Sequence, residues 1–255
     1  MNQWNGLVRK DWMWMKTSLL VATVLYVLVL IIFPLIVDKV FIHGGYLYET
    51  IVGISGFMVF CSSFLPSIIL LVMLQHEMKH PDLWLHSTAS IYKLIGSKIF
   101  LASIVGVGAL FIPFIIVIGG FSFWDLPISF AGLLAISLTI VIVAFLSSIE
   151  GIAITLLFWV IYRLLRKRIG KFSVAITLFL FLVAGFAYMK FSMSDFYLST
   201  LEFGPIPLHF LSQFSSFFED DFNNIFYIGN FLWECFITAA CFMLAVVLFD
   251  KKARY

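Results

Sequence analysis

Six long apolar runs constrain the fold of this chain more than any other feature. They occupy the stretches Ser18–Val37, Ile51–Leu74, Ile99–Gly119, Ile128–Tyr162, Phe172–Met189 and Phe231–Phe249. A helix needs about 20 apolar residues to cross the hydrocarbon core of a bilayer, and each run can supply one crossing. We therefore expect an all-α integral membrane protein with six transmembrane helices.

The composition excludes a soluble domain. Hydrophobic residues make up 62% of the 255 residues and charged residues only 12%, whereas soluble domains have about 45–50% apolar and about 25% charged residues. A chain this apolar cannot cover itself with a polar surface. The first apolar run, Ser18–Val37, is long enough to span and has no small-residue cleavage site behind it, so we expect a retained helix.

Basic residues predict the orientation, because Lys and Arg accumulate on the cytoplasmic side of membrane proteins. With the N-terminus inside, six crossings place both termini in the cytoplasm, and only Lys39 and Lys190 of the 16 basic residues fall outside. The cytoplasmic ones are Arg9, Lys10, Lys16, Lys79, Lys93, Lys98, Arg163, Arg166, Lys167, Arg168, Lys171, Lys251, Lys252 and Arg254. We expect a plasma-membrane protein whose Arg163–Lys171 loop anchors the helix ends and binds no nucleic acid.

The fourth run is too long for a simple span. Residues Ile128–Tyr162 would form a helix of about 52 Å, against a hydrocarbon core of about 30 Å. Two crossings with a turn near Ser147–Gly151 would put the following basic loop on the wrong side. We therefore predict one crossing over 128–162, with its first part lying in the outer leaflet or packed as a broken helix.

Two further segments are predicted to lie at the membrane faces. Residues 1–16 combine Trp4, Trp12 and Trp14 with cations; Trp prefers the interface and cations prefer anionic headgroups, so we expect an interfacial helix on the inner leaflet. Residues 190–230 contain a Gly-Pro-Ile-Pro turn from Gly204, followed by phenylalanines spaced along one helix face. These predict short extracellular re-entrant helices.

A polar island, residues 75–98, separates the second and third apolar runs. It is too polar for lipid but keeps apolar residues at spacings that suit short amphipathic helices, and Pro81 divides it because proline cannot continue a helix. We interpret it as a cytoplasmic docking segment. The chain contains no G-x-x-x-x-G-K-[ST] phosphate-binding loop, so we expect it to hydrolyse no ATP and to bind no cofactor itself.

A zinc site competes for the same residues. His76-Glu77-Met78-Lys79-His80 matches H-E-x-x-H, which on a helix sets two imidazoles one turn apart beside a carboxylate that can activate a zinc-bound water. Pro81 ends the helix at once, and no second motif supplies a third ligand. We keep a membrane-embedded zinc metalloprotease using His76, Glu77 and His80 as the alternative function.

Glu150 and Glu234 are the two carboxylates placed in or near lipid. An acidic side chain inside a membrane is a functional candidate, because its burial is costly without a partner. Either could line a translocation path. Glu150 could equally pair with a neighbouring helix, and Glu234, near the outer end of its span, could simply be exposed at the interface.

The layout resembles the permease subunit of a type-2 ABC exporter (ABC-2 family): an interfacial helix, six spans with both ends inside, a cytoplasmic segment after the second span and short helices before the sixth. The acidic Glu77 after the second span, Leu83-Trp84-Leu85-His86-Ser87, and Lys93-Leu94-Ile95-Gly96-Ser97-Lys98 leading into the third span resemble the family's coupling segment. The resemblance implies that an ATPase docks on Glu77, Leu83, Trp84, Leu85, His86, Ser87 and Lys93.

The resemblance also implies the partners and the activity. A separate cytoplasmic ABC ATPase dimer would hold ATP and Mg, and a second permease copy, identical or related, would complete the pathway. The chain would be no enzyme itself, but would export a hydrophobic or amphipathic substrate such as a peptide toxin or antimicrobial peptide. A third hypothesis is a membrane scaffold or immunity protein that moves no substrate.

Overall fold

The computed structural model describes residues 3–40, 47–79, 90–120, 129–205 and 227–250. These residues are helical almost throughout, and the only β pairing among them is an isolated bridge between Pro205 and Tyr227. The chain divides into two compact units, Met1–Gly151 and Ile152–Tyr255. The expectation of an all-α chain is thus confirmed for the described residues.

Five helical stretches in the described parts are long and apolar enough to cross a membrane: Gln3–Val40, Thr50–Glu77, Tyr92–Gly120, Phe130–Ser192 and Ile228–Leu248. Such helices are compatible with a multi-pass membrane protein. The fourth stretch has 63 residues and contains two of the predicted apolar runs, which is why five stretches correspond to six runs.

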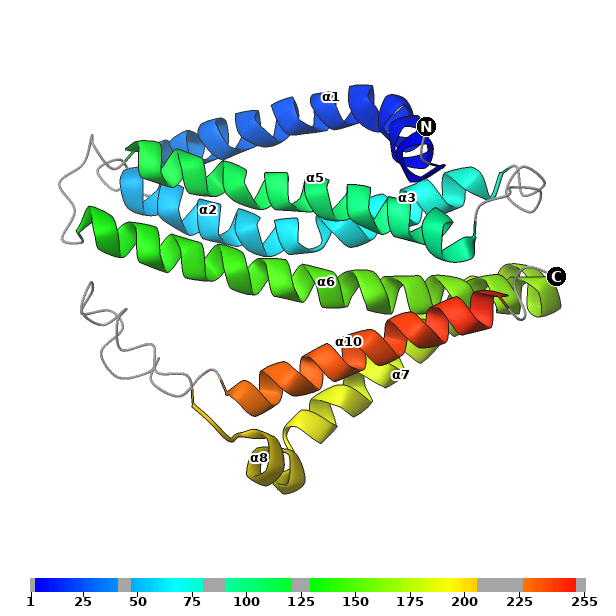
Figure 1. The fold of residues 1–255 in the computed structure, drawn as a ribbon. Coiled ribbons are helices and arrows are strands. Elements are labelled where there is room, and N and C mark those ends of the chain that lie inside the picture. The colour runs from blue at the N-terminus through cyan, green and yellow to red at the C-terminus, as the bar shows by residue number, and fades with distance from the viewer. Residues whose placement is uncertain (1–2, 41–46, 80–89, 121–128, 206–226, 251–255) are drawn as a thin grey trace. The chain divides into compact units, whose positions relative to one another are not determined.

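The first unit is built around α5 (Ile91–Gly120), which packs against α1 (Gln3–Val40), α2 (Leu47–Ser63) and α3 (Leu65–Glu77) (Figure 1). Val59, Leu110 and Val141 form a buried apolar cluster in this unit. The cluster joins α2 and α5 to the first part of α6 (Phe130–Ile169).

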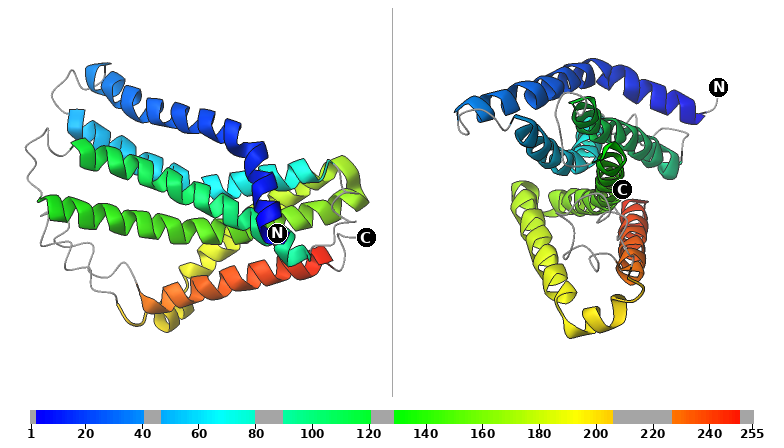
Figure 2. Two further views of the ribbon diagram at one scale, coloured as in Figure 1. Left: turned by 45° about the horizontal axis from the view of Figure 1, so that its top comes forward. Right: turned by 90° about the vertical axis from the view of Figure 1, so that its left-hand side faces the viewer.

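Helix α1 combines two elements that the sequence predicts separately. It is helical from Gln3 to Val40, and Figure 2 shows its first part, in dark blue, bent away from the remainder. Residues 3–16 of the predicted interfacial segment and the predicted span 18–37 thus belong to one bent helix. We call residues 3–16 the N-terminal segment of α1.

A proline divides the second predicted span into α2 and α3. Pro66 stands in the first turn of α3, where its missing N–H removes a helical hydrogen bond. The ring of Pro66 packs on Gly106 of α5, where an added Cβ would clash with Pro66 Cγ. Glycine at position 106 therefore permits the close approach of α3 and α5.

Helix α6 corrects the prediction of a broken fourth span. It is one unbroken helix of 40 residues, about 60 Å long. It contains no proline, so each of its residues keeps the backbone N–H that a continuous helix needs. The other alternative, that the first part of this run lies in the outer leaflet, remains a prediction.

The second unit contains the rest of α6, η2 (Gly170–Phe172), α7 (Ser173–Ser192), α8 (Asp195–Leu201) and α10 (Ile228–Leu248). Gly170 has φ 63°, a left-handed conformation that favours glycine, and there the chain turns back. Phe158 of α6 meets Phe181 of α7 at 5.2 Å between ring centroids. These two residues are nearly equidistant from Gly170, so α7 runs antiparallel to the end of α6.

Helix α8 joins the far ends of α7 and α10 (Figure 2). Its cap is Ser194, whose side chain accepts a hydrogen bond from the Tyr197 backbone N–H, and the Ile228 N–H then donates to the Gly204 carbonyl at 3.0 Å. Of the predicted extracellular helices over 190–230, the end of α7, α8 and the start of α10 are described. Residues 206–226 lie outside the described part.

Candidate functional site

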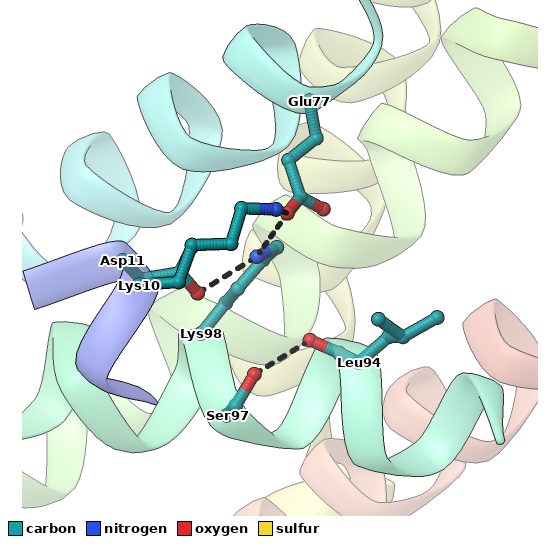
Figure 3. Close-up of polar contacts among 6 residues, drawn as sticks. All are labelled: Lys10, Asp11, Glu77, Leu94, Ser97 and Lys98. Atoms are coloured by element: carbon teal, nitrogen blue, oxygen red, sulfur yellow. Dashed lines mark hydrogen bonds and ion pairs between the residues drawn. The ribbon is translucent and has the colours of Figure 1, made fainter. Parts of the chain in front are cut away.

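A buried ion cluster lies at one end of the first unit, centred on Lys98 (Figure 3). The Lys98 Nζ donates to Asp11 Oδ2 at 2.9 Å and lies 3.1 Å from Glu77 Oε1. Lys10 Nζ donates to the same Glu77 oxygen at 3.0 Å. We call Lys10, Asp11, Glu77 and Lys98 the ion cluster.

The ion cluster is deeply buried except at one corner. The exposed fraction of the side chain is 0% for Lys98, 8% for Glu77 and 9% for Asp11, against 65% for Lys10. Two cations and two carboxylates leave the cluster formally neutral, which satisfies the rule that buried charges are paired. Removing one partner of such a buried pair is costly, because it strands an uncompensated charge.

Three helices contribute to the cluster. Asp11 lies in the N-terminal segment of α1, one turn before buried Met15, so both face the protein interior. Glu77 is the last residue of α3, and Lys98 lies in the second turn of α5. A single ammonium group therefore fixes the positions of the α1, α3 and α5 ends relative to one another.

Three further contacts join the N-terminal segment of α1 to α3 and α5. Trp14 lies against His76 with ring centroids 3.9 Å apart, and Trp4 packs over Gly96, where an added Cβ would lie 3.2 Å from the indole ring. Lys93 Nζ donates to Gln3 Oε1 at 3.3 Å. The N-terminal segment of α1 thus contacts α3 just before residue 78 and α5 just after residue 90.

The predicted docking segment 75–98 includes the ends of two long helices. Its first residues belong to α3, which ends at Glu77, and residues from Ile91 onward belong to α5. Lys93 therefore lies in the first turn of a long helix, and only residues 78–90 connect the two helices. The predicted docking residues Leu83, Trp84, Leu85, His86 and Ser87 lie outside the described part.

Glu77 is committed to contacts inside this chain. Its Oε1 atom receives both lysines, while its Oε2 atom is buried without a hydrogen-bond partner among the described residues. The sequence predicts Glu77 as a residue that a partner touches. Contact of Glu77 with a partner remains a prediction.

The same contacts bear on the zinc alternative. The ring of His76 lies against Trp14 in a tilted arrangement, and the carboxylate of Glu77 is bound by two ammonium groups. His80 lies outside the described residues. Within 3–40, 47–79, 90–120, 129–205 and 227–250, no group of three or more His, Cys, Asp or Glu side chains could hold a metal ion.

The two carboxylates predicted to lie in or near lipid belong to different units. Glu150 is half-buried on α6, next to Gly151, where an added Cβ would lie 3.1 Å from Ser67 Oγ. Glu234 is exposed in the second turn of α10, beside Trp233, which contacts Phe191 at 5.6 Å between centroids. Their predicted place on a translocation path remains a prediction.

Sequence reasoning did not identify Asp11 and Lys98 as site residues. Asp11 is the only acidic residue before Asp38, and Lys98 directly precedes an apolar run. An isolated charge beside an apolar run needs an oppositely charged partner if it is buried. The spacing along the chain could not identify that partner, because the two residues are 87 positions apart.

Comparison with known proteins does not assign the chain to a family. No protein-family model, no curated protein and no solved structure matches it. The functional conclusion therefore depends on the residues and contacts described above.

Proposed function

We propose that this chain is the membrane subunit of an ATP-driven exporter of the ABC-2 type, with residues 78–90 as the cytoplasmic docking segment. A separate ABC ATPase dimer, holding ATP and Mg, binds there, and a second permease copy completes the pathway. The substrate is hydrophobic or amphipathic, in the manner of a peptide toxin or antimicrobial peptide.

The lengths of the described helices support a chain that crosses the bilayer six times. The 63-residue stretch Phe130–Ser192 would measure about 95 Å as one straight helix, about three times the hydrocarbon core. The left-handed Gly170 and the antiparallel pair Phe158–Phe181 instead favour two crossings. With that count, the positive-inside rule sets both termini and the docking segment in the cytoplasm.

The ion cluster is the observation that carries the proposal. A motor protein can move a membrane helix only if its docking segment is joined to that helix rigidly, because a loosely attached loop would absorb the displacement. Here α3 and α5, which flank residues 78–90, are tied to each other and to α1 through buried Lys98. A displacement of either flanking helix would therefore move all three helices together.

Co-purification tests this proposal. An ABC ATPase encoded beside this gene, co-expressed with the full chain, should copurify with it in equal amount and hydrolyse ATP in the complex. Trp84→Ala or Leu85→Asp should abolish the complex. Phe172→Ala, which removes an exposed aromatic ring from η2, is the matched control and should leave the complex intact.

Two results would overturn the proposal. A complex that survives both Trp84→Ala and Leu85→Asp removes the docking role. Labelling of an exposed Ser90→Cys by a membrane-impermeant maleimide from outside intact cells, with Cys61, Cys235 and Cys241 replaced, puts the segment on the wrong side. Nucleotide-independent peptide cleavage that is lost on His80→Ala would support the zinc protease instead.

A further inference from the structure

Helical hydrogen bonding is interrupted where α2 meets α3, and Figure 1 shows a bend between these two helices. The Phe64 N–H donates to the Cys61 carbonyl, three residues back instead of four, at 3.2 Å. Pro66 has no N–H to donate to the Ser62 carbonyl. We call residues 61–66 the joint.

The joint needs only a small change of backbone angles to alter its bend. Phe64 has φ −87° and ψ −16°, whereas a regular α-helix has about −63° and about −42°. Sharp helix bends occur at proline, and hinges in proteins are a few residues at element ends that absorb changes in φ and ψ. Phe64 therefore has the position and the backbone angles of a hinge residue.

The helices on the two sides of the joint are packed unequally. Six of the 13 residues of α3 are buried, and only Ser67 among them is polar. Among the described side chains of α2, the buried ones are Thr50, Ser55, Val59 and Ser62, and three of these four carry a hydroxyl. Side-chain packing is a main force between membrane helices, so α3 is held firmly against α5 and α2 is held less firmly.

A buried hydroxyl beside the joint is unpaired in the bent form. Ser67 Oγ, in the first turn of α3, is buried without a hydrogen-bond partner among the described residues, which is unfavourable. A serine in a continuous helix can donate its hydroxyl to the carbonyl four residues back, and for Ser67 that carbonyl belongs to Ser63, across the joint. A smaller bend would therefore give the hydroxyl a partner.

We propose that the joint is a hinge with two populated positions. In the first, the span is bent as described and the Ser67 hydroxyl is unpaired. In the second, α2 swings about Phe64 to a smaller bend, and the Ser67 hydroxyl donates to the Ser63 carbonyl. Helix α3 stays fixed on α5 through the Pro66–Gly106 contact and the ion cluster. Both positions exist in the chain by itself, so the proposal does not depend on ATPase docking or export.

The test measures distances between spin labels by electron paramagnetic resonance, on the full chain in lipid nanodiscs. The native cysteines, Cys61, Cys235 and Cys241, are first replaced by alanine. Val52→Cys on α2 is then paired with Ile115→Cys on α5 or with Leu134→Cys on α6, all at exposed positions. The two pairs report a swing of α2 in different directions.

We expect at least one Val52 pair to show two distances. Val52 lies 12 residues before Phe64, about 18 Å along the helix, so a swing of about 20° displaces it by about 6 Å. The matched control pair, exposed Val72→Cys with exposed Ile104→Cys, joins α3 to α5 below the joint and should show one distance.

Proline variants assign the two distances to the joint. Pro66→Ala restores the missing N–H and should leave one distance for each Val52 pair. Pro34→Ala, which removes the proline inside α1, is the matched control and should leave the two distances in place.

Serine variants test the hydroxyl exchange. Ser67→Ala removes both the unpaired hydroxyl and the bond that it gains, so the occupancy of the second position should fall about fivefold relative to the first. Ser63→Ala keeps the acceptor carbonyl and loses only a hydroxyl that donates to the Phe60 carbonyl, so it should leave the occupancies unchanged.

Four outcomes would overturn the proposal. One distance for both Val52 pairs would show that the joint is rigid. Two distances that persist in Pro66→Ala would place the motion elsewhere, and two distances for the control pair would show that α3 itself moves on α5. Unchanged occupancies in Ser67→Ala would remove the hydroxyl exchange as the reason for the second position.

Discussion

Replacing Lys98 by methionine should destabilise the folded protein far more than replacing Lys10 by methionine. Lys98→Met keeps a side chain of similar length but leaves Asp11 buried with no other ion pair among the described residues, and leaves Glu77 with Lys10 only. Breaking a buried ion pair by removing one partner costs about 3–5 kcal/mol. For a chain of this size that is roughly 10 °C in the unfolding temperature.

The assay is thermal unfolding of the purified chain in detergent, followed by circular dichroism. Lys10→Met is the matched control, because Lys10 is 65% exposed and its loss leaves Lys98 on Glu77. An exposed pair contributes at most about 1 kcal/mol, so this variant should unfold within about 3 °C of the unmodified chain.

A third variant separates lost charge pairing from lost packing. Combining Lys98→Met with Asp11→Leu and Glu77→Met replaces the buried charges by apolar groups, which is often neutral or stabilising. We expect it to recover most of the stability that Lys98→Met loses. The reasoning is refuted if Lys98→Met unfolds like the unmodified chain, or if Lys10→Met costs as much as Lys98→Met.

Two further changes test the packing of α3 against its neighbours α5 and α1. Gly106→Ala brings a methyl group onto the rigid ring of Pro66 and should cost about 1–3 kcal/mol in thermal unfolding. Gly108→Ala, which meets nothing within 4 Å, should be neutral or slightly stabilising, and equal effects of the two would contradict the close approach of α3 and α5. Trp14→Ala removes the stack on His76 and should cost about 0.5–1.5 kcal/mol beyond the lost apolar burial. Trypsin cleavage after Lys79 should then become faster, whereas an unchanged cleavage rate would show that Trp14 does not restrain the end of α3.

The sequence predicted the apolar helices well because their cause is local. Residues 99–119 fall inside α5 and residues 172–189 nearly coincide with α7, since a continuous apolar run has no other way to satisfy its backbone in lipid. Helix ends were predicted less well. Polarity near Lys93 suggested a separate segment, but α5 already begins at Ile91 because Lys93 can remain helical while its charge reaches solvent and Gln3.

The amino-acid sequence by itself determined that this chain forms long apolar helices and on which flanks the cations gather, because these properties depend on residues a few positions apart. Only the tertiary structure decided that Asp11, Glu77 and Lys98 meet in one buried cluster. Their charges come from three helices far apart along the chain, and it is the packing of those helices that brings them within bonding distance and excludes water.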